Sequence, residues 1–61
     1  MNNYNKKKFL TPKEIASKLQ LNLVTIYSYI KKRKLIAIRI DKNYRIDQDD
    51  FEKFIESNKL R

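Results

Sequence analysis

The sequence predicts a mainly α-helical fold with a small β-hairpin, in the order helix, turn, helix, two-stranded hairpin, helix. Three observations support this prediction. Apolar residues repeat at helical spacing in three segments, residues 12–19, 22–34 and 51–55. Between the second and third segments the apolar period changes to two, which is typical of strands. The chain has 61 residues, enough for one domain near the lower limit for folding without metal or disulfide.

The first helix has a clear beginning. Thr11-Pro12-Lys13-Glu14 places a hydroxyl at the N-cap, proline at the first helical position and glutamate three residues after the cap. This is a capping box with a proline start. Ile15, Ala16 and Leu19 then form one apolar stripe, so we expect a helix from Pro12 to Leu19. A helix of about two turns is not stable alone and must be held by packing.

A short turn separates the first two helices. Asn22 is a good N-cap for the second helix, and we expect Leu21 to point back into the core. Two short helices this close together indicate a helix-turn-helix, although a helical hairpin with no role in DNA binding would have the same spacing. Gln20 stands where such turns usually carry glycine. A left-handed conformation there would cost glutamine some free energy.

The second helix has two different faces. Its inward face is apolar and consists of Leu23, Ile26, Tyr29 and Ile30. The opposite face mixes an aliphatic side chain, a phenol, a hydroxyl and an amine, and it leads into a run of four cations. Such a face suits the major groove of a nucleic-acid duplex. The alternative is a core helix that ends in solvated lysines. The outward residues and the cations are Val24, Tyr27, Ser28, Lys31, Lys32, Arg33 and Lys34.

A β-hairpin follows. Leu35–Ile40 and Tyr44–Ile46 read as strands rich in β-branched residues. The chain has no glycine, so we expect Asp41 or Asn43 at positive φ in the turn between them.

The two faces of this hairpin differ. We expect Ile36, Ile38 and Ile40 on one face and Arg39 on the other, with Ile46 inward and Arg45 outward. The register, and with it the contribution of the second strand to the core, is left open. A hairpin tip that carries cations can act as a wing, that is, a hairpin that contacts the DNA phosphates or enters the minor groove beside a recognition helix. The alternative is an edge hairpin protected from aggregation by its charges. The tip residues are Arg39, Lys42, Asn43 and Arg45.

The last helix is acidic outside and aromatic inside. Asp47 or Asp49 can cap it, and Phe51, Phe54 and Ile55 repeat at helical spacing. These side chains should close the core. The outward carboxylates would be repelled by phosphate, so we expect this helix to face away from DNA.

Charge and composition narrow the possible functions. Residues 1–45 contain 12 Lys or Arg residues and two carboxylates. Residues 46–61 contain three Lys or Arg residues and five carboxylates, so the net charge of the chain is +8. One positive face implies a polyanionic partner. An anionic membrane is a weaker alternative, because the aromatic residues do not form one helical stripe.

The absence of Cys and His argues against disulfides, zinc and catalysis. We therefore expect no cofactor, no metal and no small-molecule substrate. The sequence also lacks an apolar run long enough to cross a bilayer, so we expect no membrane span and a cytoplasmic protein.

Several short motifs occur in a fixed order over about residues 10–55. They are Leu10-Thr11-Pro12-Lys13-Glu14-Ile15-Ala16, Thr25-Ile26-Tyr27 with Ile30, Lys34-Leu35, Ala37-Ile38-Arg39-Ile40, Tyr44-Arg45-Ile46, and Asp50-Phe51 with Phe54. In this order and spacing the chain resembles the small excisionase-type, MerR-like winged helix-turn-helix DNA-binding domains. The resemblance implies a second helix in the major groove and a wing on the backbone or minor groove. By this resemblance the groove-reading residues are Thr25, Tyr27, Ser28 and Lys31, and the wing residues are Arg39, Lys42 and Arg45. Leu23 and Val24 stand where relatives often have arginine, which removes guanine-reading forks and favours A·T-rich sites.

The resemblance also sets the expected organisation and role. We expect a mobile basic tail at residues 1–8, the DNA-binding domain at 9–56 and a fraying end at 57–61. The expected partner is double-stranded DNA, bound by an excisionase-like protein or small regulator of a mobile element. A plasmid partition, replication or transcription regulator with the same binding mode is the nearest alternative. Self-association, an integrase or a replication protein would be further partners. From another class, a protein-binding adaptor could use the tyrosine-bearing surface.

Overall fold

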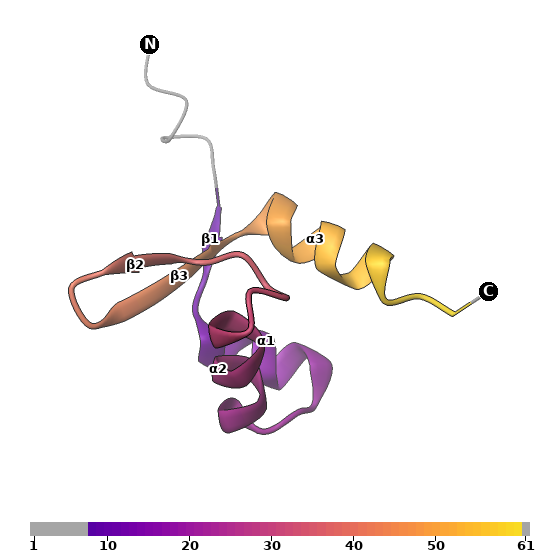
Figure 1. The fold of residues 1–61 in the computed structure, drawn as a ribbon, viewed down its shortest axis with the longest axis horizontal. Helices are drawn as coiled ribbons and strands as arrows, with labels where there is room; N and C mark the ends of the chain where they lie inside the picture. The colour runs from indigo at the N-terminus through magenta and orange to yellow at the C-terminus, as the bar shows by residue number, and fades with distance from the viewer. Residues whose placement is uncertain (1–7, 61) are drawn as a thin grey trace, which may run out of the picture.

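The computed structural model describes residues 8–60. Its elements are β1 (Phe9–Leu10), α1 (Pro12–Leu19), α2 (Leu23–Lys31), β2 (Ile38–Ile40), β3 (Asn43–Asp47) and α3 (Gln48–Ser57) (Figure 1). The expected order of helix, turn, helix, hairpin and helix is confirmed. Of the predicted mobile tail, residues 1–7 lie outside the described part of the chain, and only Lys8 is placed.

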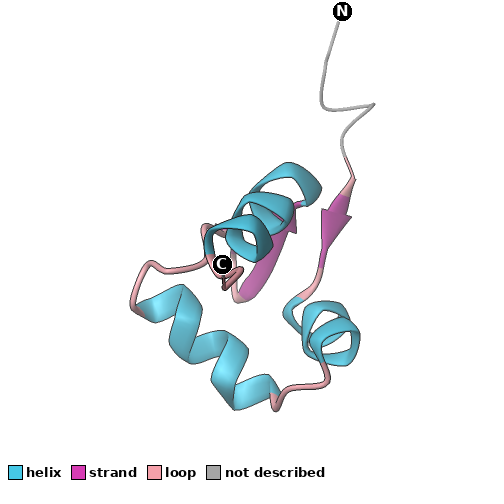
Figure 2. Ribbon diagram, turned by 90° about the vertical axis from the view of Figure 1, so that its right-hand side faces the viewer, coloured by secondary structure: helices cyan, strands magenta, loops and turns pink. Residues whose placement is uncertain are grey.

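The elements form a helical body with two projections. A three-stranded antiparallel sheet has the order β1-β3-β2. The β2–β3 hairpin projects on one side, α3 projects on the other, and α1 and α2 lie below the sheet in Figure 1. Figure 2 shows α3 nearly end-on, above the short turn that joins α1 to α2. The hairpin and the acidic helix are therefore at opposite ends of the molecule.

Helix α1 begins at the predicted capping box. The Thr11 N–H donates to Glu14 Oε1 over 2.8 Å, and the Glu14 N–H donates to Thr11 Oγ1 over 3.0 Å. The hydrogen bond from the Thr11 backbone lowers the pKa of Glu14 most, followed by the bond with the Thr11 side chain, and the charges of Lys18 and Arg45 lower it further. Two orphan backbone donors at the helix start are therefore satisfied.

The turn after α1 closes as a Schellman motif without glycine. Gln20 is left-handed, with φ 56° and ψ 46°. Its N–H donates to Ser17 O, and the Leu21 N–H donates to Ala16 O over 2.9 Å, the pair of bonds that defines the motif. Asn22 occupies the N-cap position of α2 as predicted, but its side chain makes no capping hydrogen bond.

The core gathers around four fully buried aliphatic side chains, Ile15, Ile26, Leu35 and Ile46. Leu10, Ala16 and Phe51 complete it, and Leu19, Tyr29, Ile30, Phe54 and Ile55 pack against it. The Tyr29 and Phe54 rings, with centroids 5.6 Å apart, join α2 to α3. The predicted inward faces of α1 and α3 are thus confirmed.

Two leucines expected inside are not buried. Leu21 is 42% exposed, and its side chain lines an open surface groove together with Tyr29 and Ile55. Leu23, in the first turn of α2, is also exposed. The expectation that these two side chains face the core is therefore wrong.

The segment after α2 is a loop before it becomes a strand. The sequence pattern predicts an extended segment over residues 35–40, but β2 comprises only Ile38–Ile40. The Lys34 and Leu35 N–H groups both donate to Tyr29 O, which folds the chain back over the end of α2 and buries Leu35. This contact with α2 prevents residues 34–35 from joining the ladder.

The sheet also differs from expectation at its other edge. Strand β1 does not follow from the sequence pattern, and it pairs Phe9 with Asp47 and Leu10 with Ile46. The Gln48 N–H donates to Lys8 O over 2.9 Å and extends this pairing by one residue. The apolar face of β2 is open to solvent, and its exposed isoleucines, together with the one in the preceding loop, are Ile36, Ile38 and Ile40.

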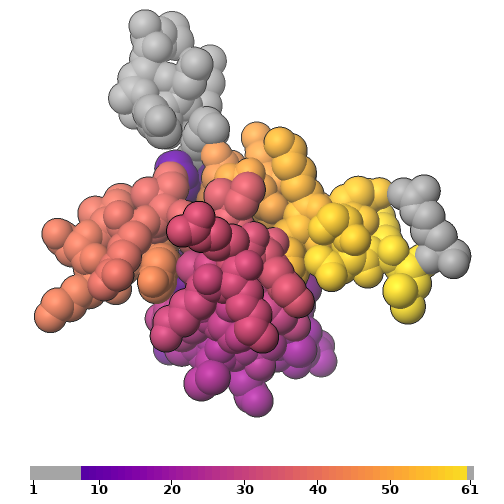
Figure 3. Space-filling model, in the orientation of Figure 1, coloured from indigo at the N-terminus to yellow at the C-terminus, as the bar shows by residue number. Residues whose placement is uncertain are grey.

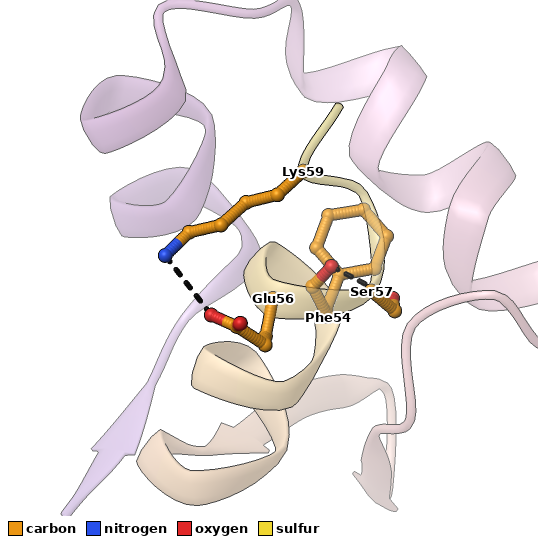
Figure 4. A network of polar contacts seen from close by, with 4 residues as sticks. All are labelled: Phe54, Glu56, Ser57 and Lys59. Atoms are coloured by element: carbon orange, nitrogen blue, oxygen red, sulfur yellow. Dashed lines mark hydrogen bonds and ion pairs between the residues drawn. The ribbon is translucent and has the colours of Figure 1, made fainter. Parts of the chain in front are cut away.

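Helix α3 is capped as predicted, because the Asp47 side chain accepts a hydrogen bond from the Asp49 N–H over 2.9 Å. At the other end, Ser57 Oγ donates to Phe54 O, and Lys59 pairs with Glu56 at 3.0 Å (Figure 4). Both partners of this ion pair are exposed, so the pair contributes little to stability. The predicted fraying of residues 57–61 stays a prediction, and Arg61 lies outside the described residues.

Candidate nucleic-acid interface

Helix α2 presents one side to solvent. Val24 is 78% exposed, the most open side chain on this helix among the large apolar residues, and Tyr27 is 37% exposed. Thr25 and Ser28 are half-buried, and Lys31 is exposed. On the opposite side Ile26 is fully buried in the core. The five predicted groove-reading residues of α2 therefore keep at least part of their surface accessible.

The cationic run at the end of α2 is a turn, not further helix. Lys31 is the last helical residue, and Arg33 is left-handed with φ 61°. The Arg33 N–H donates to Ile30 O, and the Lys34 N–H donates to Tyr29 O, so α2 ends in a second Schellman motif without glycine. All four cations, residues 31–34, are exposed, and their charge is favourable at the negative end of the helix dipole.

The register of the hairpin decides which arginine lies on the side of α2. Ile38 pairs with Arg45, Arg39 with Tyr44 and Ile40 with Asn43, around a two-residue turn. Directly paired residues project from the same face, and successive residues alternate. Arg39 and Tyr44 therefore share the face of the buried Ile46, whereas Arg45 shares the opposite face with the exposed isoleucines.

Contacts between side chains connect Arg39 to α2. The Tyr27 and Tyr44 ring centroids are 5.9 Å apart, with the rings tilted by 54°. The Arg39 guanidinium lies over the Tyr44 ring, 5.7 Å from its centroid. Arg39 Nε also donates to Asp41 O over 3.0 Å. Asp41 has φ 56°, as expected for one of the two candidate turn residues.

Arg45 is held elsewhere. It is half-buried, and its Nη1 donates to Tyr44 O over 2.8 Å. Its charge also helps to lower the pKa of Glu14, after the larger effect of the hydrogen bonds with Thr11. The structure therefore groups Arg39 with the exposed side of α2 and places Arg45 on the other face of the hairpin. Lys42 and Asn43 lie exposed at the tip.

The surface separates charges as expected from the sequence. Figure 3 shows α2 and the hairpin adjoining on one face, while α3 projects away from them. The outward residues of α3 include Asp49, Glu52 and Glu56, all exposed. A polyanion approaching α2 and the wing would therefore avoid these carboxylates.

Two features of other protein classes are absent from the part of the chain that the structure covers. Residues 8–60 contain no group of three or more His, Cys, Asp or Glu side chains arranged to hold a metal ion. Within the same range, no helix is both long and apolar enough to cross a bilayer.

Comparison with protein families now identifies the fold. A family model described as a helix-turn-helix domain matches residues 9–59, most of the chain. The chain belongs to this helix-turn-helix family. The family is of the excisionase type, and the three helices with the small antiparallel sheet fit its winged form. Its members are typically DNA-binding and not enzymatic. Searches of curated proteins and of solved structures gave no significant match.

Within this helix-turn-helix domain, α1 and α2 form the motif and the β2–β3 hairpin is the wing. The sequence pattern gives Tyr44 no role in DNA binding and includes it only in the tyrosine-bearing surface of the protein-binding alternative, whereas the structure places it between α2 and Arg39. A two-residue hairpin turn would have revealed this position, because it fixes Arg39 opposite Tyr44. The sequence pattern predicts a turn over residues 41–43 and leaves the register open, whereas in the structure Asn43 already belongs to β3.

Proposed function

We propose that this helix-turn-helix domain binds double-stranded DNA in a sequence-specific manner, with α2 in the major groove and the wing on the backbone or in the minor groove. The observation that carries the proposal is the set of contacts that joins the exposed side of α2 to Arg39, from Tyr27 through Tyr44. Groove and backbone contacts must be made simultaneously from one side of a domain. This arrangement meets that requirement.

The residues of α2 divide by chemistry. Val24 offers methyl groups suited to thymine, Thr25 and Ser28 offer hydroxyls to base edges, and Lys31 offers an amine to guanine or phosphate. Tyr27 is partly covered by Tyr44, so we assign it to the edge of the groove. The absence of an arginine fork among these five residues favours A·T-rich sites.

The remaining cations supply contacts that do not depend on sequence. Arg39 and Lys42 are the principal wing contacts in this proposal, with Asn43 beside them at the tip. Arg45, on the opposite face of the hairpin, would reach only phosphates that curve around the wing. The turn after α2 adds three cationic side chains that can contact the phosphate backbone of DNA, those of Lys32, Arg33 and Lys34.

The biological role that we propose first is that of an excisionase-like protein or small regulator of a mobile element. The support is the excisionase-type family and the small size of the domain. A plasmid partition, replication or transcription regulator would use the same surface. Self-association on DNA, or contact with an integrase or replication protein, belongs to the same proposal, since one small module buries only about 600–1,000 Å² on DNA.

A protein-binding adaptor is the alternative from another class. The exposed isoleucines on the outer face of the wing favour it, because contiguous apolar surface often marks protein contacts. Salt separates the two functions. Binding through several phosphates weakens steeply between about 50 and about 200 mM salt, whereas a contact centred on isoleucines or tyrosines does not.

Selection from a random duplex pool, followed by affinity measurements on the selected site, tests the proposal. Lys31→Glu should abolish binding while the circular dichroism spectrum stays unchanged. Lys53→Glu, an equal charge change on the exposed side of α3, is the matched control and should weaken binding only through long-range charge. Equal losses of affinity for both variants would remove α2 from the interface. Direct repeats in the selected site would favour an excisionase-type role, and inverted repeats a dimeric regulator.

A further inference from the structure

A continuous set of contacts joins the second helix to the tip of the wing. Tyr27 of α2 contacts Tyr44 of β3, and Tyr44 in turn lies beneath the guanidinium of Arg39 on β2. Arg39 is anchored a second time by its bond to Asp41 O in the turn. The two surfaces proposed to bind DNA are therefore connected through one half-buried tyrosine.

We propose that Tyr44 is a positioning residue that holds the Arg39 guanidinium toward DNA at a fixed offset from α2. This inference rests on the proposed function, because Arg39 needs a nucleic-acid partner for its orientation to matter. Tyr44 itself is not assigned a DNA contact. It acts through Arg39 on one side and Tyr27 on the other.

The chemistry of the three groups supports this role. An arginine side chain is long and samples many rotamers when exposed, and each rotamer that becomes inaccessible on binding weakens the complex. A ring beneath the guanidinium restricts these rotamers in the free protein through a cation–π interaction. The bond to Asp41 uses the Nε–H, one of five guanidinium N–H donors. The Nη groups can then face a phosphate or a base edge as a preformed fork.

The backbone supports the same role. Arg39 and Tyr44 are directly paired across the hairpin, which is the closest approach available to side chains on one face. The left-handed Asp41 presents its carbonyl to the same guanidinium.

A purely structural role for Tyr44 would have a different signature. If Tyr44 only covered the core beside Tyr27, its replacement would lower stability and leave the number of phosphates neutralised unchanged. The salt dependence of binding reports that number, since the slope of log K against log salt becomes shallower by about 0.9 for each phosphate that the protein no longer neutralises. The slope therefore separates positioning from packing.

The experiment uses the full 61-residue chain with Tyr44→Phe, Tyr44→Ile, Arg39→Gln and the double variant Tyr44→Ile/Arg39→Gln. Isoleucine keeps strand propensity and apolar cover but removes the ring. We expect Arg39→Gln and Tyr44→Ile each to reduce the salt slope by about 0.9, and the double variant by no more than either. Tyr44→Phe should keep the wild-type slope, because its ring is retained. Independent, additive reductions, or an unchanged slope in Tyr44→Ile, would overturn the proposal.

A second variant keeps the test decisive if Tyr44→Ile unfolds. Arg39 is exposed, so Arg39→Lys should fold normally. Lysine keeps the charge, so we expect the wild-type salt slope. It lacks the planar fork and the Nε–H that bonds Asp41 O, so we expect the affinity at a fixed salt concentration to fall. An unchanged affinity for Arg39→Lys would show that charge alone suffices and would overturn the positioning role. Lys31→Glu, measured in parallel, identifies the other failure: if it binds normally, the proposed function itself is wrong.

Discussion

Replacing the buried Leu35 should come close to unfolding the domain, whereas replacing its neighbour Ile36 should not. Leu35 is 1% exposed and Ile36 is 63% exposed. A Leu→Ala change at a fully buried site costs about 2–5 kcal/mol, because it removes apolar packing and leaves a cavity. The chain has 61 residues, and at roughly 0.05–0.15 kcal/mol per residue its total stability is about 3–9 kcal/mol. Leu35→Ala therefore removes a large fraction of that stability.

Ile36→Ala is the matched control, since a change at an exposed site usually alters stability by less than about 0.5 kcal/mol. Urea unfolding followed by circular dichroism gives both free energies of unfolding, provided that the slopes of the two transitions agree. Equal destabilisation by the two changes, or a larger effect of Ile36→Ala, would refute the burial of Leu35 beneath the end of α2. That result would instead support the continuous strand over residues 35–40 that the sequence pattern predicts.

Three further predictions concern the helices. Gln20→Gly should stabilise the domain by about 1 kcal/mol, because glycine adopts the left-handed conformation of this turn without strain. Ser17→Gly within α1 should destabilise the domain by about the same amount, because glycine disfavours the helix interior. Urea unfolding of both variants measures these changes in the free energy of unfolding. The pKa of Glu14 is lowered below its ordinary 4.5 in the folded state, so its contribution to stability is complete above that pH and is lost as the pH falls through the folded pKa. Glu14→Gln should therefore weaken the acid dependence of thermal unfolding between about pH 6 and about pH 3, and an unchanged dependence would contradict the capping box. Phe51→Ala should cost about 3–5 kcal/mol, and Phe54→Ala less, because Phe51 is buried and Phe54 only half-buried.

The parts of the fold that follow from local chemistry could be predicted from the sequence. The capping box fixes the start of α1, and Asp47 fixes the start of α3, each through residues no more than three apart. The left-handed residues at the α1–α2 turn and at the hairpin turn followed from the lack of glycine and from spacing. The charge separation between α3 and the rest of the chain followed from composition alone.

The parts that depend on distant contacts could not be predicted. Strand β1 has two residues and exists because Leu10 pairs with Ile46 across the sheet, and a two-residue segment carries no periodicity. Leu35 is buried because residues 34–35 bond to Tyr29 O, which no pattern within residues 35–40 reveals. The role of Tyr44 depends on the hairpin register, which the sequence pattern left open and which the pairing of Ile40 with Asn43 fixes.

The most direct test of the central claim is an amide NMR titration of the domain with its selected DNA duplex. If one face binds DNA, the amide signals of residues 24–31 and 39–43 should shift or broaden together, while those of α3, residues 49–56, should stay in place. Shifts confined to α3, or shifts on α2 without any on the wing, would contradict a single interface formed by the second helix and the hairpin.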